Sequence, residues 1–146
     1  AMLIPGGAVA KHAKSLAGFL KVTRGKGFKW GVDHSSAALA TNLRLIGAPK
    51  GCTACQAHHI IPGGEKFASA IQARSILANH GIDINSFMNG VWLDKAVHNS
   101  RYLKSYSDAI YDRLRHANAA GGKPSVYSEL KALQQELQSG QWDHLL

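Results

Sequence analysis

The chain has 146 residues, 45% of them hydrophobic, which is enough for one domain with a hydrophobic core but too few for two. No segment approaches the roughly 20 apolar residues that a membrane-spanning helix requires, so no membrane segment is predicted. The net charge of +8 is concentrated in residues 1–64, which hold eight Lys and Arg against one acidic residue. Such a half-molecule should attract a polyanion, most commonly nucleic acid, although solubility or an acidic protein partner would also account for the charge.

Two helices are expected before residue 50. Apolar residues at helical spacing predict an amphipathic helix over residues 8–22, and a serine cap predicts a second one from Ser35 or Ser36 to about Ile46. Between them, residues 23–31 interleave cations, aromatics and glycines. That composition suits a loop that touches phosphate and stacks on bases, or a connector whose aromatic side chains anchor it to the core.

Two cysteines, Cys52 and Cys55, form a single C-x-x-C. A structural zinc site usually needs two such half-sites, and this chain has only one. With His58 the pattern could supply three ligands, and a C-x-x-C can also be a redox pair. A local disulfide or two small residues in a turn is the simpler interpretation, and no function is assigned to the pair.

A short strand is expected at Ile60 and Ile61, ended by the Pro-Gly-Gly that follows. A third helix should run from Glu65 to about His80. Its expected buried stripe consists of Phe67, Ile71, Arg74 and Leu77.

The Asn89-Gly90 pair predicts a turn before a second short strand at residues 91–93. Asp94 stands where a helix cap belongs, which predicts a long helix to about Asn118. Its expected buried stripe consists of Leu103, Tyr106, Ile110 and Leu114. Gly121, Gly122 and Pro124 should break the chain before a last helix over residues 125–138.

The adjacent histidines His58 and His59 are the strongest indication of chemistry. A soluble domain rarely needs two neighbouring imidazoles for packing, because each has two ring nitrogens to satisfy and both titrate near neutral pH. A helix carrying His98 follows the second strand, and this ββα order can hold a divalent metal with an imidazole beside it. Neighbours in a regular strand point to opposite faces, so a bend or strand end is needed if both histidines face one site.

The chain resembles the AHH branch of the HNH nuclease superfamily, named for the triplet found here at residues 57–59. The resemblance runs from Gln56 to about Leu114. It rests on Ala-His-His-Ile-Ile-Pro at 57–62, Gly-Ile-Asp-Ile-Asn at 81–85, Asn-Gly-Val-Trp-Leu at 89–93, and His98 with Tyr106.

This resemblance implies a DNA-cleaving, metal-dependent endonuclease of the α+β class, a mostly helical domain around a ββα-metal core. We expect a single nuclease domain over residues 1–146. It would comprise a helical extension (1–50), the core with its helical insertion (51–118) and a C-terminal helix (119–146). Relatives are usually the C-terminal module of a larger bacterial toxin, delivered into the cytoplasm of a competing cell and neutralised at home by an immunity protein. The Ala1-Met2 start, with no signal-peptide pattern, fits a fragment of such a protein.

The resemblance implies that His58 and His98 are metal ligands and that His59 is the general base. It also implies that Asn89 either braces the strands or orients the base. Many relatives carry a further histidine where this chain has Tyr102, and a phenol is a poor ligand because its ordinary pKa is about 10. Two imidazoles with water and substrate oxygens favour magnesium or manganese, although zinc and nickel also fit.

Arg101 and Lys104 are expected near the site as phosphate contacts, or as ordinary solvated cations. An RNA-cleaving enzyme of the same fold is one alternative function. The other is a module that binds nucleic acid or an acidic immunity protein without catalysis.

Overall fold

The computed structural model of the protein describes residues 36–97 and 102–146. The elements in chain order are α3 (Ser36–Leu45), β1 (Cys55–His59), α4 (Ala68–Asn79), the 3₁₀ helix η1 (Phe87–Asn89), β2 (Gly90–Asp94), α5 (Lys104–Gln138) and the 3₁₀ helix η2 (Asp143–Leu145). This mixture of helices and one two-stranded sheet confirms the α+β class. Within the described part of the chain, no helix has the length and apolar character needed to cross a membrane.

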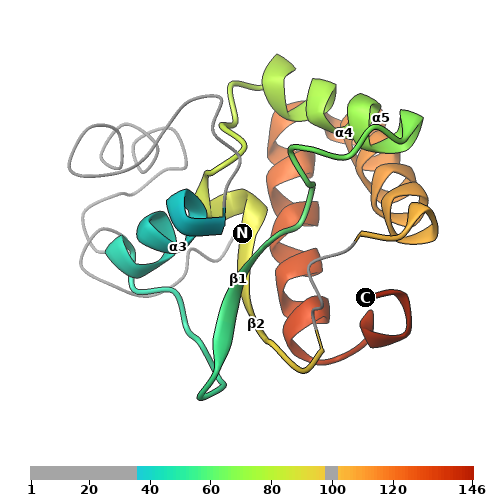
Figure 1. The fold of residues 1–146 in the computed structure, drawn as a ribbon. Coiled ribbons are helices and arrows are strands. Elements are labelled where there is room, and N and C mark those ends of the chain that lie inside the picture. Colours follow the sequence, from blue (N-terminus) through green and yellow to red (C-terminus); the bar gives the residue numbers. More distant parts are fainter. Residues whose placement is uncertain (1–35, 98–101) are drawn as a thin grey trace.

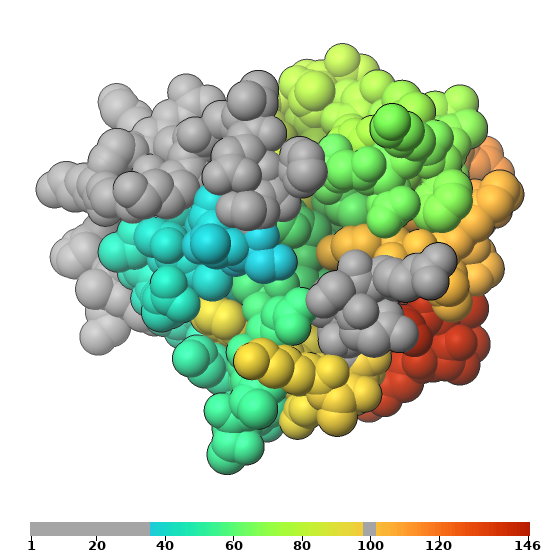
Figure 2. Space-filling view, viewed as in Figure 1, coloured from blue at the N-terminus to red at the C-terminus, as the bar shows by residue number. Residues whose placement is uncertain are grey.

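The two strands form the centre of the fold. β1 and β2 pair antiparallel, with Cys55 opposite Asp94 at one end and His59 opposite Gly90 at the other. Figure 1 shows α3 on one side of the strands, α5 on the other, and α4 above, packed on α5. In Figure 2 the surfaces of α3 and the segment around β1 adjoin on the face shown, in agreement with the contacts between these elements.

Helix α3 forms as predicted and packs against the strands. Its residues at spacings of three and four, Leu39, Asn42 and Leu43, lie on one buried face. Gly90 lies under this helix, because a Cβ there would be 2.5 Å from the Cδ1 of Leu39. Gly90 has extended backbone (φ −132°) and begins β2, so close packing rather than a left-handed turn explains the glycine.

The first strand carries the histidine pair, as the ββα order predicts, but it ends before Ile60 and Ile61. β1 ends at His59, and Ile60 and Ile61 follow it as fully buried residues in irregular backbone. Their apolar, β-branched character reflects burial in the core, which a strand and a buried turn both require. The second strand, by contrast, was predicted correctly apart from one residue at each end.

The long helix begins nine residues later than predicted, with Leu103 rather than Asp94 at its cap position. Asp94 caps a short turn instead of a helix: its Oδ1 accepts from the Ala96 N–H at 2.9 Å. Helix α5 starts only at Lys104, and Tyr102 precedes it. Asp favours both turns and helix caps, so the residue alone could not distinguish them. Tyr106, Ile110 and Leu114 are buried as expected, whereas Leu103, outside the helix, is 45% exposed.

Helix α4 also differs in its buried face. It begins at Ala68 rather than Glu65, and Ile71 is 47% exposed, contrary to the prediction. Leu77 is buried as predicted, but the other buried side chains include the small Ala70 and Ala73. Small alanines let α4 and α5 approach closely, and a pattern based on large apolar residues does not detect such a face.

The predicted break near residue 122 is confirmed. Gly122 has φ 64° and ψ −143°, a conformation that essentially only glycine adopts, and Pro124 follows it. α5 therefore consists of two helical halves, and Figure 1 shows the first in lighter orange and the second in darker orange-red.

An ion-pair network joins the two halves of α5. Arg113 in the first half pairs with Glu129 and forms a bidentate pair with Glu136 in the second, at 2.9 and 2.8 Å. Trp142 donates its indole N–H to Glu136 at 3.0 Å, and its ring meets the edge of Tyr106 at a centroid distance of 5.7 Å. The network thus fixes the wall of the core on which Tyr106 lies.

Replacing Glu136 by glutamine should lower the free energy of unfolding by about 1 kcal/mol at neutral pH, a modest value because the pair is partly exposed. Hydrogen bonds from Arg113, and then from Trp142, lower the pKa of Glu136 below its usual 4.5. A depressed folded-state pKa gives stability that is present above the unfolded pKa and is lost as pH falls through the folded one. The difference between wild type and variant should therefore shrink below about pH 4.5.

Thermal unfolding of both proteins at neutral and acidic pH measures this difference. Asp108→Asn, which removes the exposed Lys104–Asp108 pair, is the control and should leave Tm nearly unchanged. An equal Tm for wild type and Glu136→Gln at pH 7 would contradict the assignment.

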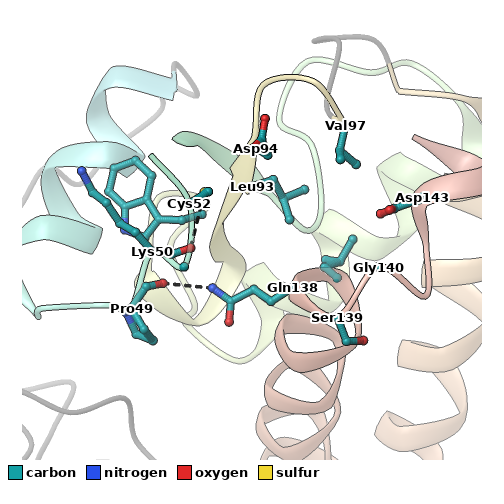
Figure 3. A pocket seen from close by; sticks show the side chains of 13 residues that line it. Pro49, Lys50, Cys52, Leu93, Asp94, Val97, Gln138, Ser139, Gly140 and Asp143 are labelled. Atoms are coloured by element: carbon teal, nitrogen blue, oxygen red, sulfur yellow. Dashed lines mark hydrogen bonds between the residues drawn. The ribbon is translucent and has the colours of Figure 1, made fainter. Parts of the chain in front are cut away.

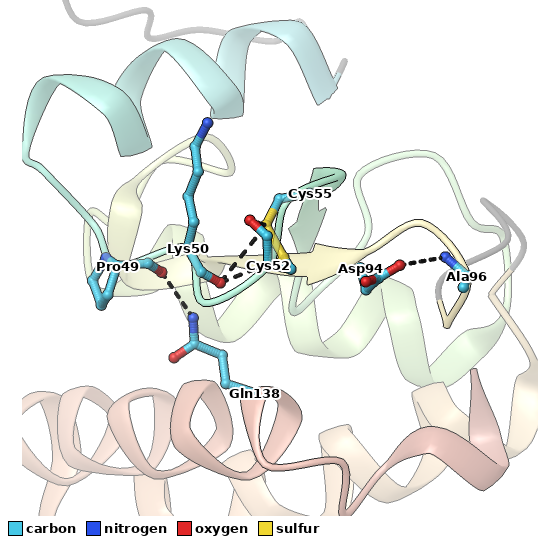
Figure 4. The surroundings of a disulfide bond; sticks show 7 residues. All are labelled: Pro49, Lys50, Cys52, Cys55, Asp94, Ala96 and Gln138. Atoms are coloured by element: carbon cyan, nitrogen blue, oxygen red, sulfur yellow. Dashed lines mark hydrogen bonds between the residues drawn. A yellow bond between two sulfur atoms is a disulfide. The ribbon is translucent and has the colours of Figure 1, made fainter.

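The two cysteines form a disulfide. Cys52 and Cys55 close the turn that leads into β1, beside Lys50 and near Asp94 (Figure 4). This confirms the simpler interpretation of the C-x-x-C. Because both sulfurs are bonded to each other, neither is a thiolate ligand, and a three-ligand site with His58 does not form in this state.

Candidate active site

His58 is fully buried between two tyrosines. Its Nε2 lies 3.0 Å from the hydroxyl of Tyr106, and its ring stacks on Tyr102 at a centroid distance of 5.1 Å. Tyr106 comes from the first turn of α5 and meets the His58 ring edge-on. Two elements distant in sequence therefore enclose one imidazole.

The hydroxyl of Tyr106 determines which His58 nitrogen carries a hydrogen. It donates its single hydrogen to the Ile60 carbonyl at 2.8 Å, so it can only accept from His58. Burial, and then the neighbouring Tyr102, raise the pKa of Tyr106, which keeps that hydrogen in place. Neutral His58 therefore has its hydrogen on Nε2 and its lone pair on Nδ1.

Tyr102 contacts both histidines without being a charged ligand. Its ring stacks on His58, and its hydroxyl donates to the backbone carbonyl of His59 at 2.9 Å. Burial raises the pKa of the Tyr102 phenol well above its ordinary value, so the group stays neutral. The hydrogen bond fixes the end of β1.

His59 faces a different neighbour. It is 4% exposed, and its Nε2 lies 2.9 Å from Oδ1 of Asn85, in the segment between α4 and η1. The two adjacent rings thus contact different partners, as strand geometry requires. β1 ends at His59. The expected strand end, at which two neighbouring side chains could face one site, is therefore present.

Asn89 connects the segment after β1 to the segment before β2. Its Oδ1 accepts from the Ile61 N–H at 2.8 Å, and its Nδ2 donates to the carbonyls of Ile61 and Ile84 at 3.0 and 2.9 Å. The side chain is fully buried. These contacts with backbone suit a brace that holds the histidine end of the sheet closed.

The comparisons with known proteins give one family. Residues 41–138, about two thirds of the chain, match AHH, described as a nuclease family of the HNH/ENDO VII superfamily with conserved AHH. The chain belongs to the AHH nuclease family. Neither the curated proteins nor the solved structures give a match.

Family membership confirms the resemblance and extends it. The match begins in α3 and ends with α5, so it reaches beyond the Gln56–Leu114 segment on both sides. Membership of an HNH-superfamily nuclease family implies phosphodiesterase activity on nucleic acid. The Ala-His-His triplet of the AHH nuclease family ends β1 in this protein.

Three predicted site residues remain to be placed. His98 and Arg101 lie outside the described residues. Lys104 begins α5, with its side chain 69% exposed, and pairs with Asp108 at 2.7 Å. Tyr102 precedes α5, so it does not lie on the long helix that Asp94 was expected to cap.

The donor set of this AHH nuclease suits a metal ligand at His58. A histidine that binds a metal usually donates its other ring N–H to a hydrogen-bond acceptor, and the Tyr106 hydroxyl accepts in that way here. Among residues 36–97 and 102–146, no group of three or more His, Cys, Asp and Glu side chains could hold a metal ion. A divalent ion at His58 would therefore also need His98, water or substrate oxygens.

A separate cavity lies away from the two histidines. About 410 Å³ in volume, it is lined by the turn before β1, the end of β2 and the residues after α5, including Lys50, Asp94 and Asp143 (Figure 3). In the strand register this is the end opposite to His59. It is not part of the histidine site.

Two contact residues were not given a role from the sequence. Tyr106 was expected as a core residue and as part of the family resemblance, and Asn85 only as part of the Gly-Ile-Asp-Ile-Asn motif. Both contact a ring nitrogen of the histidine pair. The sequence offered one indication, since an Asn in a short apolar motif must have its amide satisfied when it is buried.

Proposed function

We propose that this AHH nuclease is a metal-dependent endonuclease that hydrolyses DNA, with His59 as general base. One observation carries the proposal: two adjacent imidazoles, both buried, each with one ring nitrogen held by a specific partner, at the triplet that names the family. A single buried histidine can be explained by packing alone. Two adjacent histidines, each fixed by a hydrogen bond, suit acid–base chemistry and metal binding.

In the proposed reaction, neutral His59 takes a proton from the water that attacks the phosphorus. Asn85 orients the ring through Nε2, and Tyr102 holds the His59 backbone through its carbonyl. His58, with its hydrogen on Nε2, offers Nδ1 as a ligand atom. His98 is the proposed second ligand. The bond between the phosphorus and the 3′ oxygen breaks, which leaves 5′-phosphate and 3′-hydroxyl ends.

A divalent ion bound by these histidines supplies Lewis-acid stabilisation of the charge that develops on the phosphate. Magnesium or manganese is the proposed ion, because two imidazoles leave most positions to oxygen ligands, with zinc and nickel as alternatives.

The charge of the chain supports a nucleic-acid substrate. The net charge is +8, and residues 1–64 contain a single acidic residue. Such a field raises the association rate with a polyanion and weakens with salt. Arg101 and Lys104 are the proposed phosphate contacts. Contacts of this kind carry little base information, so we expect weak sequence preference.

We further propose that the domain acts as the C-terminal module of a delivered bacterial toxin, in the cytoplasm of the target cell, and is neutralised by an acidic immunity protein. The support is the family and the charge. An anionic inhibitor would be captured quickly by a cationic domain.

The substrate assignment can be tested with end-labelled DNA and RNA duplexes of the same sequence, incubated with the domain and manganese. DNA should be cut, and the products should carry 5′-phosphates. Cleavage confined to RNA would replace this proposal with the RNA-cleaving alternative.

A further inference from the structure

The partner of His59 belongs to a segment that is fixed from several sides. Residues 82–86 connect α4 to η1 without helix or strand, yet Asn85 is 1% exposed. The Asn85 N–H donates to Oδ1 of Asp83 at 2.9 Å, and the preceding Ile84 carbonyl accepts from Asn89. These hydrogen bonds hold the short irregular segment in place.

Helix α3 supplies the strongest of these anchors. Nδ2 of Asn42 donates to the Asn85 carbonyl at 2.7 Å, and Asn42 is fully buried on the face that carries Leu39 and Leu43. A polar side chain on an apolar helix face is costly unless its hydrogen bonds are made. Its placement connects α3, through Asn85, to the histidine at the end of β1.

We propose that Asn42 and Asn85 form a positioning relay that selects the ring tautomer of His59. This inference rests on the proposed function. The carboxamide oxygen of Asn85 can only accept, so the His59 nitrogen 2.9 Å away must carry the hydrogen. The lone pair of the neutral ring is then on Nδ1, and Nδ1 is the atom that takes the proton from water.

The backbone of Asn85, held by Asn42, sets where the carboxamide points. Neither asparagine touches the reacting atoms, so both are positioning residues. Loss of the Asn85 acceptor would let the ring adopt either tautomer and rotate, which lowers kcat more than it changes KM. Partners that orient a functional histidine typically contribute about 10- to 100-fold.

The tautomer can be measured without any activity assay. In protein labelled with ¹⁵N in its imidazole rings, the two nitrogen shifts of His59 distinguish an Nε2–H ring from an Nδ1–H ring at alkaline pH, where imidazoles are neutral. His59→Ala assigns the signals by difference. We expect Nε2–H in the wild type. An Nδ1–H ring in the wild type would overturn the relay, even if the protein is an active nuclease.

Variants then test the relay in kinetics. Asn85→Leu, which removes the acceptor at similar volume, should lower kcat about 10- to 100-fold and mix the tautomers, whereas Asn85→Asp, which keeps an acceptor, should retain the Nε2–H ring and most of the activity. Asn42→Leu should lower kcat in the same direction by a smaller factor. Unchanged tautomer and unchanged kcat in Asn85→Leu would overturn the relay.

Gln134→Leu is the matched control for loss of a buried amide. Gln134 is 8% exposed and donates its amide to the carbonyls of Phe87 and Gly90 rather than to His59 or Asn85. It should lose stability while keeping the Nε2–H tautomer and kcat. If the control shifts the tautomer as much as Asn85→Leu does, the effect is general loosening and the relay is wrong. If the wild type is inactive on every nucleic acid, the proposed function fails, while the tautomer still decides the relay.

Discussion

Replacing His59 by alanine should lower kcat for DNA cleavage by about 10²- to 10⁴-fold, the usual contribution of a general base. Tyr102, whose hydroxyl contacts the His59 backbone, cannot replace the ring as a base, because burial raises its pKa and keeps the phenol neutral. The variant removes the ring that contacts the buried Asn85 Oδ1, so about 1–3 kcal/mol of stability should be lost and the domain should stay folded. Steady-state cleavage of a fluorogenic DNA duplex, with Tm measured in parallel, gives both quantities.

His116→Ala is the matched control. His116 lies on the exposed surface of α5, so the same chemical change there should leave kcat and Tm close to wild type. A His59→Ala protein that cuts DNA at the wild-type rate would remove the histidine from the mechanism and favour the interpretation as a binding module.

Replacing Asn89 by alanine should lower the free energy of unfolding by about 3 kcal/mol or more. The change orphans the Ile61 N–H and two carbonyls, those of Ile61 and Ile84, and each unsatisfied buried group costs about 1–3 kcal/mol. For a domain of this size Tm should fall by roughly 10 °C. Denaturant unfolding and calorimetry measure the loss.

Asn79→Ala is the comparison for Asn89, because Asn79 is exposed at the end of α4 and its loss should change Tm little. Below its lowered Tm, the Asn89→Ala protein should retain measurable kcat, since the side chain holds backbone and touches no reacting atom. A loss of kcat as large as that of His59→Ala in a fully folded Asn89→Ala protein would contradict the bracing role.

The elements that the sequence predicts well are those whose signal is local. Helix α3, strand β2 and the break at Gly122 each depend on short-range features: a serine cap, a short apolar run after an Asn-Gly turn, or glycines followed by a proline. The α+β class and the nuclease family were also predictable, because the Ala-His-His triplet and the motifs around it are specific.

The features that escaped prediction depend on tertiary contacts. Ile60 and Ile61 look like a strand but are buried in a turn, and Asp94 looks like a helix cap but closes a turn. In each case the residue type fits both structures, and only packing decides between them.

The histidines of the candidate site could be predicted from the sequence, but the residues that position them could not. The sequence indicated His58 and His59, but Asn42, Asn85 and Tyr106 come from other elements and meet the pair only in the fold. Hydrogen bonds between side chains far apart in sequence leave no periodic pattern. A buried polar residue on an apolar face, such as Asn42 beside Leu39 and Leu43, is the one trace that they leave.

The most direct test of the account is the integrity of supercoiled plasmid DNA after incubation with the purified domain, in magnesium or manganese and with or without a chelator. The account predicts that the wild type degrades the plasmid with the metal, that the chelator prevents this, and that His59→Ala leaves the plasmid intact. Plasmid and RNA that both stay intact with magnesium, manganese, zinc and nickel would contradict it.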